Sequence, residues 1–114
     1  MTALVTGILL AGAFAALGAA KIAKTSSMRV RAEHVGFSAG GYQLIGVAEV
    51  LGAAGVAAGL ASAPVGYAAG AGLLLLLAGA VGTHLRSGDR VADVAPAVLF
   101  AVGTVVYLLA LGAS

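Results

Sequence analysis

Four long apolar stretches, separated by shorter polar or turn segments, run along the 114-residue chain. They cover about residues 2–20, 42–60, 67–84 and 94–112, and Glu49 is the one charged side chain among them. A helix needs about 20 apolar residues to cross the hydrocarbon core of a bilayer. The pattern therefore predicts an all-α fold: a membrane-embedded four-helix bundle in which residues 1–114 form a single domain with four transmembrane spans.

The first connecting segment, residues 21–37, is polar and holds four of the six basic residues, Lys21, Lys24, Arg29 and Arg31. Two interpretations stay open for it. It is either a plain polar loop or a short helix along the membrane interface, because Met28, Arg31, Ala32 and Val35 would share one side of a helix.

The other two connections are shorter. Pro64 and Gly66 give residues 61–66 the chemistry of a turn between antiparallel neighbours. Gly88 ends the third span, and Asp93 is expected to cap the fourth helix, with Pro96 inside its first turn.

The distribution of positive charge predicts the topology. All six basic residues lie in the connections after the first and third spans, which an odd–even count places on one side. Basic connections face the cytoplasm, so we expect a multi-pass protein of the inner (plasma) membrane with both termini outside, N-out and C-out. The first apolar stretch is expected to be a retained helix and not a signal peptide, because its basic residues follow it instead of preceding it.

Composition excludes several classes of function. The chain is 61% hydrophobic and 9% charged, which is far from a soluble domain, and six basic residues used as topology signals do not make a nucleic-acid surface. Without cysteine it can hold neither a thiolate metal site nor a redox disulfide.

Glu49 is the first candidate for chemistry, because a carboxylate inside a membrane span is rare and is a functional candidate by default. Lys21 ends the first span on the same side and is its natural partner. Tyr42 shares the helical face of Glu49 and is a candidate ligand-binding residue. The alternative is a carboxyl group that only ties two helices together.

A second cluster, His84, Arg86 and Asp89, ends the third span. A histidine beside a carboxylate and a guanidinium can move protons or hold an anionic or quinone-like head group. Alternatively, the cations only complement the helix C-terminus while Asp89 pairs with Arg86 or Arg90. His34 and His84 lie on the same predicted side, but no ligand spacing supports a metal or haem site, and we expect none.

Two other tyrosines have simpler interpretations. Tyr67 is expected to anchor the third span at the outer interface. Tyr107 lies deep in the fourth span, where its hydroxyl either lines a cavity or makes a hydrogen bond between helices.

Several motifs occur in a recognisable order along the chain. They are Ala19-Ala-Lys21, His34-Val-Gly-Phe37, Ile45-Gly-Val-Ala-Glu49-Val-Leu-Gly52 and Gly79-Ala-Val-Gly-Thr-His84-Leu-Arg86-Ser-Gly-Asp89. Together they resemble the DoxX-like family of small bacterial four-helix membrane proteins, over nearly the whole chain. The resemblance implies a four-helix bundle and, for some relatives, association with redox systems such as thiosulfate:quinone oxidation or oxidative-stress complexes. It implies no particular reaction.

The leading hypothesis is an accessory or redox-associated membrane subunit. It would hold a quinone-like or lipid-like ligand near the cytoplasmic leaflet, using Lys21, Glu49 and His84, and would work with a redox-protein partner or a second copy of itself. One alternative is a small proton-coupled transporter, because small multidrug antiporters also combine four spans with one membrane carboxylate. Another is a membrane enzyme with Glu49 as acid and His84 as base, and the last is a purely structural protein. The sequence does not indicate which cofactor, if any, the protein uses.

Overall fold

The computed structural model describes residues 1–23 and 26–113, so Lys24 lies outside the described residues. Its helices are α1 (Thr2–Ile22), α2 (Ser26–His34), α3 (Ala39–Gly59), α4 (Ala63–Arg86) and α5 (Val91–Ala113), and no strand occurs among the residues described. All of them except α2 are long and apolar enough to cross a membrane. The all-α fold with four candidate spans is therefore confirmed.

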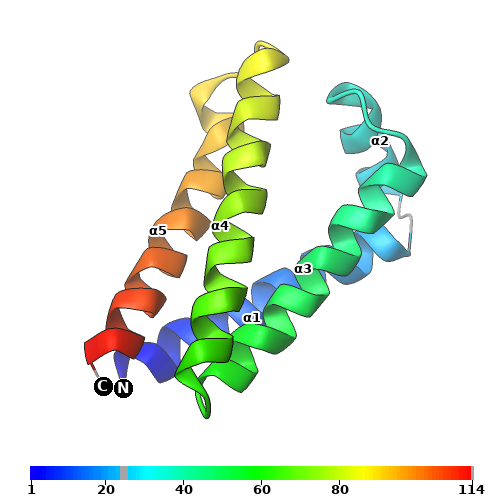
Figure 1. The fold of residues 1–114 in the computed structure, drawn as a ribbon. Coiled ribbons are helices and arrows are strands. Elements are labelled where there is room, and N and C mark those ends of the chain that lie inside the picture. The colour runs from blue at the N-terminus through cyan, green and yellow to red at the C-terminus, as the bar shows by residue number, and fades with distance from the viewer. Residues whose placement is uncertain (24–25, 114) are drawn as a thin grey trace.

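The four long helices form a ring in chain order. The α1 helix packs against α3 and α5, and α4 packs against α3 and α5 (Figure 1). One end of the bundle carries both termini and the α3–α4 turn, and the other carries α2 and the α4–α5 loop (Figure 1). All of the basic residues that the structure describes belong to this second end, which we call the loop end.

The α2 helix belongs to the first connection and settles its conformation. It packs against α3 and α1, and it buries Met28 and Ala32, two of the residues expected to share one side of a helix. The short helix is therefore confirmed, and the plain polar loop is wrong.

Two expectations about helix starts are wrong. The α4 helix begins at Ala63, so Pro64 lies in its first turn and not in the connection; this position tolerates proline because the first N–H groups of a helix have no partner inside it. Asp93 is the third residue of α5 and not its N-cap. Its carboxylate reaches back 3.1 Å to accept from the Arg90 N–H, and this earlier start places Pro96 in the second turn.

Glycines let the helix backbones meet. A Cβ atom at Gly18 of α1 would lie 2.6 Å from the carbonyl oxygen of Gly46 in α3, and one at Gly59 would lie 2.4 Å from the Cα of Gly66 in α4. Such contacts admit no side chain, so these glycines set the separation of neighbouring helices.

The Tyr107 hydroxyl joins α5 to α3. It is fully buried and donates a 2.7 Å hydrogen bond to the Val56 carbonyl oxygen. This is the helix–helix hydrogen bond that was one of the two expectations for Tyr107, and it fastens the bundle near the α3–α4 turn.

Candidate functional site

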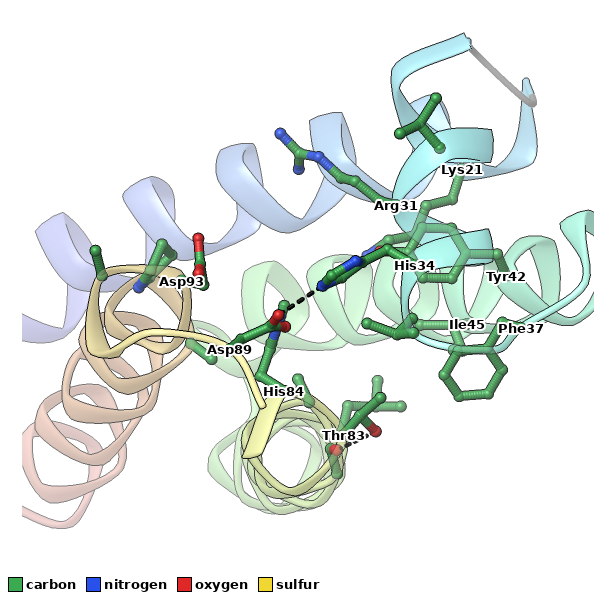
Figure 2. Close-up of a pocket in the computed structure, with 18 of the residues that line it drawn as sticks. Lys21, Arg31, His34, Phe37, Tyr42, Ile45, Thr83, His84, Asp89 and Asp93 are labelled. Atoms are coloured by element: carbon green, nitrogen blue, oxygen red, sulfur yellow. Dashed lines mark hydrogen bonds and ion pairs between the residues drawn. The ribbon is translucent and has the colours of Figure 1, made fainter. Parts of the chain in front are cut away.

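A cavity of about 760 Å³ occupies the loop end of the bundle. The α1, α2 and α3 helices line one side of it, and α4, α5 and the loop between them line the other (Figure 2). Its polar lining residues are Lys21, Arg31, His34, Tyr42, Thr83, His84, Asp89 and Asp93. Its apolar and small lining residues are Val30, Val35, Phe37, Ile45, Leu75, Leu76, Gly79, Ala80, Ala92, Pro96 and Ala97.

Lys21 reaches this cavity from the last turn of α1 while paired with Glu49. Its ammonium group donates to the Glu49 carboxylate, and the two side chains are only 12% and 6% exposed. The close contact of α1 and α3 brings these residues together, because Gly18 and Gly46 leave no side chains between the helices. The Lys21 Nζ also lies 5.0 Å from the centre of the Tyr42 ring, a cation–π distance.

Asp89 is shared by two histidines at the loop end. One of its carboxylate oxygens lies 2.5 Å from His34 Nε2, and the other lies 2.6 Å from His84 Nδ1. Figure 2 shows His34 of α2 and His84 of α4 directed at this carboxylate, which is 8% exposed. An ionised carboxylate only accepts hydrogen bonds, so each histidine must carry a hydrogen on the nitrogen that faces Asp89.

These contacts change the protonation of both groups. The hydrogen bonds from His84 and His34 lower the pKa of the Asp89 carboxyl below its usual range. The hydrogen bond to Asp89 and its negative charge raise the pKa of the His34 imidazole, and Asp93 adds to this effect. The pair therefore favours a carboxylate facing an imidazolium.

The structure places the expected site residues in two groups. Lys21 with Tyr42, and His84 with Asp89, all line the one cavity. Glu49 is buried behind Lys21 and does not line it, and no hydrogen bond or ion pair joins Glu49 to His84 within the described ranges. Arg86 is exposed and also lies outside the lining.

The expectation that Asp89 pairs with Arg86 or Arg90 is wrong, because its carboxylate binds His34 and His84 instead. Sequence reasoning missed His34 as the partner of Asp89, 55 positions away. It also missed Arg31 as a residue of the cavity lining. The only available signal was that all these residues belong to connections on the same side of the membrane. No group of three residues able to hold a metal ion is found among residues 1–23 and 26–113.

Four apolar helices around a cavity with a polar end define a multi-pass integral membrane protein, which implies a lipid bilayer as its surroundings. The model of the DoxX-like family matches residues 5–107. The chain belongs to the DoxX-like family, and the resemblance carried by its motifs is confirmed. No curated protein and no solved structure matches the chain.

Proposed function

We propose that the protein binds a lipophilic, quinone-like molecule in the loop-end cavity and serves as an accessory, redox-associated subunit of the plasma membrane. The observation that carries the proposal is the division of the cavity into a polar and an apolar part. Its volume of about 760 Å³ lies within the range of roughly 300–1,000 Å³ that is usual for small-molecule sites.

The apolar part suits a hydrocarbon tail. Leu75, Leu76 and Ala80 of α4 and Ile45 of α3 line it, and all four belong to candidate membrane spans. A tail placed there passes from the bilayer into another apolar environment, so its apolar surface is not exposed to water.

The polar part suits an uncharged head group. Three cations around the cavity, Lys21, Arg31 and the His34 imidazolium, are matched by three carboxylates: Asp89 and Asp93 in the lining, and Glu49, which pairs with Lys21 behind it. A binding site with balanced charge does not favour an anionic ligand, whereas carbonyl oxygens can accept hydrogen bonds from cations without adding charge. This balance favours a quinone-like head over an acidic phospholipid.

The cytoplasmic position follows from the basic residues of the loop end. The accessory role, with electrons exchanged through a partner redox protein, extends the proposal beyond binding. The transporter and the acid–base enzyme have less support, because each requires Glu49 to reach the ligand, and Glu49 is buried behind Lys21 outside the lining.

A matched pair of glycines tests the proposal. Gly79 and Gly72 are both exposed on α4, and a Cβ at either would meet nothing within 4 Å, but only Gly79 lines the cavity. Binding of a ubiquinone with a single isoprenoid unit would be measured by calorimetry on the protein in nanodiscs. We expect Gly79→Phe to weaken binding at least about tenfold, equal to 1.4 kcal/mol, because its ring enters the cavity.

The control variant, Gly72→Phe, adds the same ring to the same helix outside the cavity and should bind like the unchanged protein. Equal binding by the two variants, or no saturable binding by the unchanged protein, would refute a ligand site in this cavity.

A further inference from the structure

The helices on the two sides of the cavity are held together by different contacts at the two ends of the bundle. Near the α3–α4 turn, Gly59 and Gly66 bring the backbones together, and Tyr107 adds its hydrogen bond to Val56. At the loop end, α2 packs on α1 and α3, and among the described residues it makes no close backbone contact with α4 or α5. His34 of α2 nevertheless reaches Asp89 of the α4–α5 loop by a side-chain contact (Figure 2).

We infer that His34, Asp89 and His84 form a latch that holds the two sides of the cavity together at its loop end and controls access to it. The regulatory role of the latch rests on the proposed function, because it presupposes that the cavity binds a ligand. Its mechanics can be tested without any ligand.

The latch joins α2 to the end of α4, because each of the two oxygens of the Asp89 carboxylate binds one histidine. His84 holds Asp89 from within the end of α4, which leaves one carboxylate oxygen for His34 of α2. Because Gly59 and Gly66 fix the opposite end, loss of the His34 contact would let α2 and the α4–α5 loop move apart about that end. Hinge motions of this kind are carried by a few residues at element ends.

Protonation sets the strength of the latch. The lowered pKa of Asp89 means that its contribution is present above the ordinary carboxyl value and is lost as pH falls through the lowered value. The raised pKa of His34 means that its charge-assisted contribution is complete below the ordinary histidine value and is lost as pH rises through the raised value. The latch is therefore strongest between about pH 4 and pH 6.5.

The other charged groups around the latch do not remove this dependence. Two cations also line the cavity, Arg31 of α2 and Lys21 of α1. The charge of Lys21 is neutralised by its ion pair with Glu49. Asp93 of α5 strengthens the imidazolium form of His34. The pH response therefore depends mainly on His34 and Asp89.

The absence of cysteine from the chain permits a direct test. Spin labels at Ser27→Cys on α2 and Val91→Cys on α5, two exposed residues outside the cavity lining, report the separation across the loop end. Double electron–electron resonance would be recorded in nanodiscs at pH 5.5 and pH 9.5. We expect the distance to lengthen by more than about 2 Å at the higher pH, the scale of segment rearrangements.

Three further variants complete the test. Asp89→Asn and His34→Gln should each give the long distance at both pH values, whereas Glu33→Gln, which removes the carboxylate next to His34 outside the lining, should behave like the labelled protein alone. Unchanged distances in Asp89→Asn and His34→Gln would overturn the latch whatever the cavity binds. A pH response that persists in them would also overturn it. If Asp89→Asn fails to fold by circular dichroism, His34→Gln and the pH comparison decide the result.

Discussion

The Lys21–Glu49 ion pair offers the sharpest quantitative prediction. Exposed ion pairs contribute about 0–1 kcal/mol to stability, whereas removing one partner of a buried pair costs about 3–5 kcal/mol, because it leaves an uncompensated charge. The Lys21 and Glu49 side chains are 12% and 6% exposed, which places this pair in the buried group. Lys21→Met should therefore lower the free energy of unfolding by about 3–5 kcal/mol.

The double variant separates pairing from packing. Lys21→Met combined with Glu49→Leu removes both charges and keeps side chains of similar volume, so it should recover most of the lost stability. Arg86→Met serves as the control, because it removes an exposed cation at the loop end and should change stability by no more than about 0.5 kcal/mol.

The assay is unfolding of the purified protein in mixed micelles with increasing SDS, followed by far-ultraviolet circular dichroism. A loss in Lys21→Met as small as in Arg86→Met would refute the buried pair. If the double variant is as unstable as Lys21→Met alone, the lysine stabilises the bundle by packing and not by its charge.

Two further predictions use the same unfolding assay. Gly59→Ala should lose about 1–3 kcal/mol, because its Cβ would lie 2.4 Å from the Gly66 Cα, whereas Gly72→Ala has open space and should gain about 0.4–1 kcal/mol; equal effects would contradict the close contact. Tyr107→Phe should lose about 1–3 kcal/mol, because it leaves the buried carbonyl of Val56 without the phenol hydrogen bond, and an unchanged midpoint would contradict that bond.

The approach of Lys21 to Glu49 followed from the sequence in part. Both residues lie near the same ends of consecutive antiparallel spans, so their depth could be predicted from the rise of about 1.5 Å per residue of a helix. That Glu49 turns away from the cavity could not be predicted, since its direction depends on how α1 and α3 cross at Gly18 and Gly46.

The sequence by itself determined the class of this protein. The length of an apolar run is compared directly with the thickness of a bilayer, so four spans and the segments between them can be identified without tertiary information. The family could also be recognised, because its motifs lie within single segments.

Only the tertiary structure decided which residues share a site. His34 and Asp89 are 55 residues apart, and nothing local to either one specifies the other. Their meeting depends on the packing of α2 against α3 and on the angle at which α4 diverges from α3 beyond their shared turn (Figure 1), and the packing of whole helices determines both. Hydrophobic patterning specifies the length and membrane depth of each helix, but the rotation and crossing of helices place side chains around a cavity.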